Sequence, residues 1–243
     1  MSVDPAASDH DLDSDPGSAG SGSDEVPAGS PRTTRVLLGV IVVAVLVIAV
    51  AGGWFWGNRS QSDGPSTPSS TSVDAGFARD MAVHHRQAVT MAEYAMTRST
   101  DANVRLLAFD IDATQSVQLG EMQGWLESWR LSPTSNARPM TWMGPEHAQH
   151  VGADGLMPGM ATRAQMARLQ SASGRALDVL FLQLMIRHHQ GGVAMAQYAA
   201  RHAHEPYVVL LAQKMVNLQT AEITQMEQML RQRGGKPLPP PDV

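Results

Sequence analysis

Two stretches of the sequence place adjacent histidines between methionines at the same spacing. Residues 81–92 read MAVHHRQAVTMA and residues 185–196 read MIRHHQGGVAMA, so four of the nine histidines form two pairs 104 positions apart. Imidazole nitrogen and thioether sulfur are both ligands of soft metal ions, and copper, especially Cu(I), suits the two together. The pattern indicates either a metal site or a polar layer inside a helical core.

Helical periodicity places both histidines of each pair on a buried face. At 100° per residue, His84 and His85 share an arc with Phe77 and Met81, while charged side chains lie opposite. A buried imidazole that leaves a nitrogen without a partner costs about 1–3 kcal/mol. A metal ion would satisfy several of these nitrogens at once. The alternative is a layer in which imidazoles and amides bond to one another.

Folding each half of the sequence as a helical hairpin brings further polar residues level with the histidines. Gln115 and Gln118 lie opposite the first pair, and Gln219 and Glu222 lie opposite the second. Methionines lie one turn above and below, and Asp178 lies on the inner face two turns before the second motif. The predicted metal ligands are His84, His85, His188, His189, Met81, Met91, Met185, Met195, Glu222 and Asp178.

The segment that joins the two halves, residues 131–173, carries more histidine and methionine at i, i+3 spacing. It is rich in Pro and Gly and has little core of its own, so it could form a lid, a transfer arm or a second soft-metal site. A hydrophobic flap over the end of the bundle is the alternative. The residues of this candidate second site are His147, His150, Met140, Met143, Met157 and Met160.

Composition argues against several other kinds of site. The chain has no cysteine and therefore no disulfide or thiolate ligand. This composition counts against zinc, whose protein ligands usually include thiolate or carboxylate groups. Di-iron bundle enzymes need Glu-x-x-His pairs, and no Glu here has a His three residues later. The net charge of −5 suggests no nucleic-acid partner. Enzymatic activity is not expected, although a copper-dependent oxidoreductase stays open.

The elements that must position these residues form an internal repeat. Residues 77–96 and 181–200 share nine identities in twenty, and the same offset continues to Met122/Met226 without a gap. Each unit reads as two helices, the second of them spanning residues 101–130 in the first unit. Pro206 suits the first turn of the last helix. The predicted fold class is all-α, a four-helix bundle of two repeated antiparallel hairpins.

The bundle domain is expected at residues 74–233, with repeat one at 74–130, the connector at 131–173 and repeat two at 174–233. A short extended tail, 234–243, follows. The domain holds fourteen of the fifteen methionines, an excess that favours a soft ion.

The residues before the domain predict a membrane anchor. Residues 1–35 are acidic and rich in Ser, Gly and Pro, which indicates a disordered tail. Residues 36–56 carry no charge and are long enough to cross a bilayer as one helix. Arg32 and Arg35 favour a cytoplasmic N-terminus, with a cleaved signal peptide as the alternative. Residues 57–73 would then be a flexible linker to a domain outside the membrane.

The stretches MPGMATRAQMARLQSASG, FLQLMIRHHQGGVAMAQYA and LLAQKMVNLQTAEITQM resemble the bacterial domain of unknown function 305 family, over about residues 74–233. The resemblance implies a ferritin-like four-helix bundle and export, and some members are associated with copper. It also implies that His188 and His189, with Met185 and Met195, form the family's core motif and that Glu222 matches its last helix. The first repeat matches less well, because it has glutamine, at position 118, where the second has Glu222.

These observations predict a membrane-anchored, extracytoplasmic metal-binding protein that sequesters or delivers copper through His and Met side chains. The alternative is a tethered helical interaction module, with an unidentified protein partner, whose histidines are only part of the core.

Overall fold

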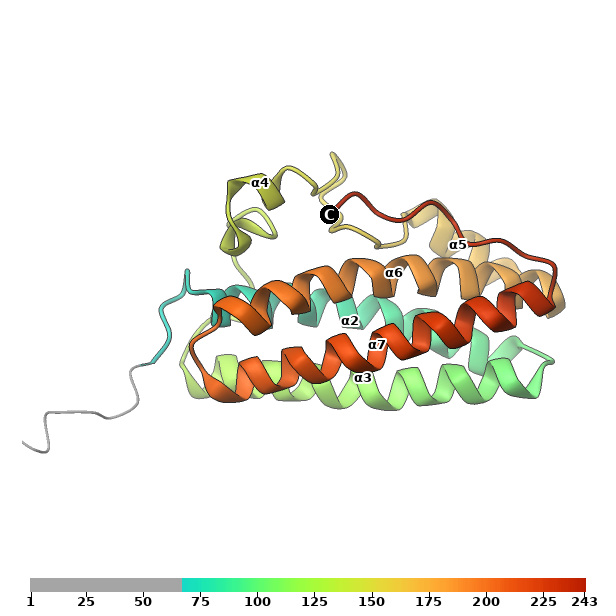
Figure 1. The fold of residues 1–243 in the computed structure, drawn as a ribbon, viewed down its shortest axis with the longest axis horizontal. Helices are drawn as coiled ribbons and strands as arrows, with labels where there is room; N and C mark the ends of the chain where they lie inside the picture. Colours follow the sequence, from blue (N-terminus) through green and yellow to red (C-terminus); the bar gives the residue numbers. More distant parts are fainter. Residues whose placement is uncertain (1–66) are drawn as a thin grey trace, which may run out of the picture. The chain divides into compact units, whose positions relative to one another are not determined.

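The computed structural model describes residues 67–243, and in this range the chain is helical without a strand. The long helices pack as two antiparallel hairpins, and the connector between the hairpins lies over one side of the bundle (Figure 1). The long helices are α2 (Val73–Arg98), α3 (Ala102–Ser128), α6 (Gly174–His202) and α7 (Pro206–Gln232), and the connector holds η1 (Thr141–Met143), α4 (Pro145–Ala148) and α5 (Arg163–Ser171). The predicted all-α fold is confirmed.

The predicted acidic tail (1–35), transmembrane helix (36–56) and first part of the linker lie outside the described residues. From residue 67 onward, no helix combines the length and the apolar composition that crossing a membrane requires. The last residues of the predicted linker are fixed to the domain, because the Arg79 guanidinium donates to the carbonyl and the hydroxyl of Ser70.

Local capping groups explain where the long helices begin. The Ser72 hydroxyl accepts the Ala75 N–H at 3.2 Å, so α2 starts just before the expected residue 74. Asp101 caps α3 through a carboxylate oxygen that accepts the N–H groups of Asn103 and Val104. Pro206 occupies the first turn of α7 as predicted, where its missing N–H removes no helical hydrogen bond.

The hairpins pack through α2 against α6, and two hydrophobic clusters fill the interior. One cluster contains Phe77, Met81 and Met195, and the other contains Met91, Phe181 and Met185. On α2, the residues of the first cluster precede the histidine pair and those of the second follow it. The four histidines therefore lie where the two clusters meet.

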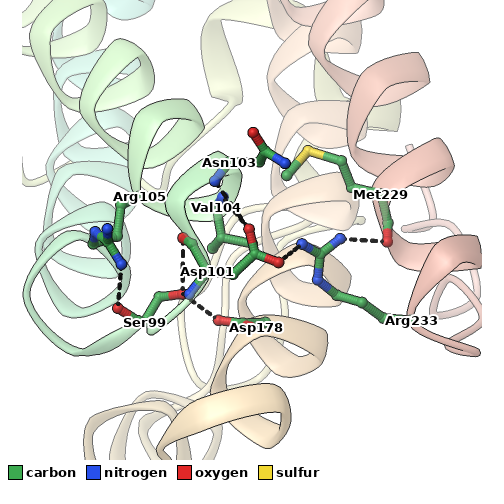
Figure 2. Close-up of polar contacts among 8 residues, drawn as sticks. All are labelled: Ser99, Asp101, Asn103, Val104, Arg105, Asp178, Met229 and Arg233. Carbon is green, nitrogen blue, oxygen red and sulfur yellow. Dashed lines mark hydrogen bonds and ion pairs between the residues drawn. The ribbon is translucent and has the colours of Figure 1, made fainter.

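Repeat-related aspartates join the two hairpins at opposite ends of the bundle. Asp178, near the start of α6, accepts the Ser99 hydroxyl at 2.6 Å in the α2–α3 turn (Figure 2). Asp74, near the start of α2, accepts the backbone N–H groups of His204 (3.0 Å) and Glu205 (2.8 Å) in the α6–α7 turn. Each repeat therefore holds the turn of the other, and we call the first of these contacts the Ser99–Asp178 clasp. Beside it, Arg233, the C-cap residue of α7, pairs with Asp101 (Figure 2).

Residues 157–161 of the connector, which we call the strap, lie directly on the bundle. The Gln87 amide donates to the Ala161 carbonyl at 2.9 Å and accepts its N–H at 2.6 Å. A Cβ on Gly191 of α6 would lie 2.0 Å from the carbonyl oxygen of Pro158, which no real packing allows. Glycine at position 191 is therefore what lets the strap contact α6.

The C-terminal residues 235–243 have no regular secondary structure and pack on the domain. The Gln183 amide of α6 donates to the Lys236 carbonyl at 2.7 Å, and Leu238 packs on a core cluster. Asp242 reaches His150, with 3.5 Å between the carboxylate oxygen and Nδ1.

Candidate metal centre

Eight polar side chains form a buried layer across the bundle between the two hydrophobic clusters. Each of the four histidines is at most 1% exposed, and the other four members are at most 8% exposed. We call this set the histidine layer. Its members are His84, His85, Gln115, Gln118, His188, His189, Gln219 and Glu222.

At the centre of the layer, repeat-related histidines of the two hairpins stack. The rings of His84 and His188 have their centroids 3.7 Å apart and are tilted by 34°. Gly192 of α6 permits this approach, since a Cβ there would lie 3.2 Å from Cε1 of His84 and 2.6 Å from the Gln219 side-chain oxygen.

Three of the four histidines have an acceptor opposite Nε2. His85 faces Oε1 of Gln118 at 2.7 Å, His189 faces Oε2 of Glu222 at 2.7 Å, and His188 faces the backbone carbonyl of His84 at 3.0 Å. A carbonyl or carboxylate oxygen can only accept, so a neutral imidazole in this position carries its proton on Nε2. The lone pair of each ring is then on Nδ1.

These lone pairs have no partner in the protein. Nδ1 is buried without a hydrogen bond in three of the rings, those of His85, His188 and His189. The His84 ring lies against the Pro158 backbone of the strap, which partly opposes the lowering of its pKa by burial. Metal-binding histidines characteristically donate one N–H to a carboxylate or carbonyl and present the other nitrogen to the metal. Three rings of the layer have this arrangement, so each presents the kind of nitrogen donor that a metal-binding histidine offers.

Burial keeps the imidazoles of His84, His85 and His188 neutral near neutral pH. It lowers the pKa of His84 to about 3 and that of His85 to about 4, and it holds the pKa of His188 well below 6.5. The neighbouring histidines lower these pKa values further, because nearby positive charges repel. The hydrogen bond from His85 to Gln118 opposes the effect of burial on the pKa of His85. Near neutral pH the lone pairs are free to bind a cation.

The predicted thioether ligands lie next to the layer. Met81 and Met185 precede their histidine pairs by three and four residues, which is one helical turn on the same face. Met91 and Met195 lie on the far side of each pair, and all four methionines are fully buried. Within residues 67–243, no three His, Asp or Glu side chains are arranged as a metal-binding group. Met81 and Met185 are therefore placed beside the histidine pairs by helical spacing alone.

The predicted ligand Asp178 is not part of the layer, and Gln115, an expected member, has no hydrogen-bond partner there. Asp178 lies outside the layer, ten residues before His188 on α6, and bonds to Ser99. At a rise of 1.5 Å per residue that separation is about 15 Å along the helix. Gln115 is in the layer as expected, but both atoms of its amide are buried without a partner.

The candidate second site is divided between the core and the surface. Met140, Met143 and Met157 are buried in the cluster that also contains Met81, and Met160 packs against that cluster. Met157 and Met160 line one surface pocket together with His150, whereas Met140 and Met143 do not line it. The His147 ring lies 5.4 Å from Tyr198 and 6.4 Å from the His150 ring. The structure thus gives most of this segment a packing role, closest to the predicted hydrophobic flap.

A groove of about 640 Å³ between α3 and α7 leads to the layer. Its walls include Trp125, Tyr207 and Leu210, and Gln118 of the layer also lines it. The side chain of Glu222 is 11% exposed. The polar partners of His85 and His189 are therefore the members of the layer nearest to solvent.

Sequence reasoning missed the residues that hold the strap and the hairpins in place around the layer. Gly191 and Gly192 admit the strap and His84, Gln87 holds the strap, and Ser99 binds Asp178. One signal was present: two adjacent glycines interrupt a strongly helical pattern at positions where the first repeat has Gln87 and Ala88. The strap itself gives no local signal, because its contacts are with helices distant in sequence.

Comparison with known proteins identifies relatives of this domain. Residues 74–230 match the family described as Domain of unknown function (DUF305). A solved DUF305 protein from Streptomyces coelicolor is 44% identical, with a TM-score of 0.65, and the match covers 70% of this chain and 99% of that one. A DUF305 fragment from Deinococcus radiodurans is 34% identical, with a TM-score of 0.55 and coverage of 66% and 96%. No curated protein sequence matches significantly.

A third similar structure has a metal ion bound. CopM in its Cu(I)-bound form is 26% identical, with a TM-score of 0.52, and the match covers 67% of this chain and 98% of that one. CopM has also been solved in Cu(II)-bound and Ag-bound forms.

Proposed function

This chain belongs to the DUF305 family, and we propose that it is a copper-binding protein that holds or hands over the ion through buried imidazole and thioether groups. The observation that carries the proposal is the set of buried Nδ1 atoms without a partner on rings whose Nε2 is already bonded. A purely structural layer would leave these polar atoms buried at a cost of about 1–3 kcal/mol each.

The side chains around these nitrogens favour copper. Imidazole suits several transition metals, but thioether sulfur selects soft ions such as Cu(I). Met81 and Met185 are one turn from the histidine pairs and fully buried. The similarity to CopM, solved with Cu(I), Cu(II) and Ag, supports the same class of ion.

His84 and His188 would hold the ion at the centre of the layer, since they come from different hairpins and their rings already stack. His85 and His189 would supply further Nδ1 donors, kept in one tautomer by Gln118 and Glu222. The α3–α7 groove would give the ion a path to solvent. The proposal also places the domain outside the cytoplasm, on the anchor predicted at residues 36–56.

The test is a Cu(I) titration of the full-length protein, under reducing conditions and against a chelator of known affinity. The layer variant is H84A/H85A/H188A/H189A, and the matched control is H147A/H150A/H202A/H204A, which removes four histidines outside the layer. We expect the layer variant to bind Cu(I) about 100-fold more weakly, or more, and the control to bind like the wild type. Circular dichroism establishes that each variant is folded.

The smaller change H84A/H188A supplies the same comparison if the fourfold variant does not fold. Equal affinity of wild type and folded layer variants, or loss of affinity in the control alone, would contradict the proposal.

A further inference from the structure

A pocket apart from the histidine layer is lined by two guanidinium groups. It has a volume of about 270 Å³ and lies between the start of α2 and the beginning of the connector. Arg79 of α2 and Arg138 of the connector line it, and no member of the histidine layer does. We call it the arginine pocket. Arginine stays protonated in proteins, so both groups carry a permanent positive charge.

Arg79 is a buried cation whose hydrogen-bond partners are all neutral. The residue is 5% exposed, and its guanidinium donates to the carbonyl and the hydroxyl of Ser70 and to the carbonyl of Ser132. It forms no ion pair with a carboxylate of residues 67–243. A guanidinium has five N–H donors, so two remain after these three bonds. Buried arginine is rare unless it is paired, so Arg79 needs a reason beyond packing.

The hydrogen bonds of Arg79 tether two chain segments to α2, but this role does not require a positive charge. The equivalent position of the second repeat, 104 residues later, is Gln183. Its neutral amide also tethers a chain segment, because it donates to the Lys236 carbonyl in the C-terminal tail. The tethering role therefore accounts for a hydrogen-bond donor at this position and leaves the charge of Arg79 unexplained.

The wall of the arginine pocket is fixed by Asp80 and Trp142. Oδ2 of Asp80 accepts the Met140 N–H at 2.7 Å and the Trp142 indole N–H at 2.8 Å, so this carboxylate is bonded to the wall. A Cβ on Gly76 would lie 2.3 Å from Cγ of Trp142. Glycine at position 76 therefore lets the indole lie close against α2.

The exposed side of the pocket offers further donors. One nitrogen of the Arg138 guanidinium donates to the Val151 carbonyl at 2.7 Å, and the side chain is otherwise exposed. Ser70 and Thr71 also line the pocket. Guanidinium and hydroxyl groups are the donors that bind carboxylate and phosphate oxygens, and arginine binds both groups with two parallel hydrogen bonds.

We propose that the arginine pocket binds a small oxyanion, the carboxylate or phosphate group of a ligand, between Arg79 and Arg138. Arg79 supplies the N–H donors that the tether leaves over, and Arg138 supplies donors from the exposed side. The volume is below the range of about 300–1,000 Å³ typical of sites for drug-sized molecules, so the ligand is small. This site is independent of the proposed copper function, because it uses none of the layer side chains.

Titration of the full-length, ¹⁵N-labelled protein with inorganic phosphate, and separately with acetate, tests the proposal at constant ionic strength. The readout is the indole N–H resonance of Trp142, which is identified among the five tryptophans by the variant W142F. We expect this resonance to shift to saturation with at least one probe. The lower of the two dissociation constants shows whether the pocket prefers a phosphate or a carboxylate group.

The variants R79Q and R138Q each remove one guanidinium from the pocket. R79Q introduces the residue type that the second repeat has at position 183, so α2 should tolerate it. The control is R86Q, which removes an exposed arginine of the same helix outside the pocket. Each pocket variant should weaken binding by about tenfold or more, because it removes charged hydrogen bonds, and the control should bind like the wild type.

A Trp142 shift that stays linear with both probes overturns the proposal, as does an R86Q variant that loses as much affinity as R79Q and R138Q. If R79Q does not fold, R138Q decides. The Arg138 guanidinium has a single hydrogen bond within the described residues, so its removal should leave the fold intact.

Discussion

The imidazoles of His84 and His188 stack at the centre of the bundle with their ring centroids 3.7 Å apart. They occupy equivalent positions in the two repeats, and each comes from the helix that packs on the other hairpin. Two rings at this distance in a buried layer cannot both become charged without strong repulsion. The stability of the fold should therefore depend on pH.

We expect the free energy of unfolding to be constant above about pH 6.5, the pKa of histidine in an unfolded chain, and to fall at lower pH. Burial lowers the pKa of His84 to about 3 and that of His85 to about 4, so over this interval the unfolded chain binds protons that the folded one does not. Each such histidine should remove about 1.4 kcal/mol per pH unit. Urea unfolding at pH 7.5, 6 and 5 measures the slope.

The variant H84Q should have a shallower pH slope, and the control H147Q, outside the layer, should keep that of the wild type. Stability that does not change between pH 7.5 and 5 would mean that these imidazoles are accessible to protons in the folded state.

The contact between Gly191 and the strap gives a prediction about packing. G191A places a Cβ 2.0 Å from the Pro158 carbonyl oxygen, so the strap must move, and we expect a loss of about 1–3 kcal/mol. In α3, Gly120 has open space where its Cβ would be, so G120A should stabilise the protein by about 0.5–1 kcal/mol. Chemical denaturation measures both. If G191A and G120A changed the free energy of unfolding equally, the strap would not be in close contact with α6 at Gly191.

The Ser99–Asp178 clasp should contribute measurably to stability. D178A leaves the buried hydroxyl of Ser99 without its acceptor, and we expect it to cost about 1–3 kcal/mol. A double-mutant cycle with S99A should give a coupling energy of about 1 kcal/mol. D110A removes an exposed carboxylate of α3 and serves as the control. Additive losses in the cycle would contradict the clasp.

The helices and the composition of the layer could be predicted because both depend on local periodicity. His84 and His189 lie on faces that the 3.6-residue repeat already marks as buried, and the constant offset of 104 implies equivalent hairpins. What Asp178 binds could not be predicted in this way. Its inward position is a local property, but its partner Ser99 is 79 residues away and is brought near only by packing of the hairpins.

The roles of the ring nitrogens also depend on tertiary structure. Adjacent residues in the sequence, His188 and His189, donate to different kinds of acceptor, a backbone carbonyl and a carboxylate. Composition offered the connector as a possible second soft-metal site, and its methionines Met140, Met143 and Met157 are buried in the same hydrophobic cluster as Met81. Methionine count alone does not distinguish a thioether ligand from a flexible core side chain.

The most direct test is the ¹⁵N NMR spectrum of the histidine rings in the full-length, ¹⁵N-labelled protein, before and after one equivalent of Ag(I). Before addition, His85 and His188 should be neutral tautomers protonated at Nε2. Ag(I) should then shift the Nδ1 resonances of layer histidines and leave those of the histidines outside the layer unchanged. Shifts confined to histidines outside the layer, or Nδ1-protonated rings within it, would contradict the account.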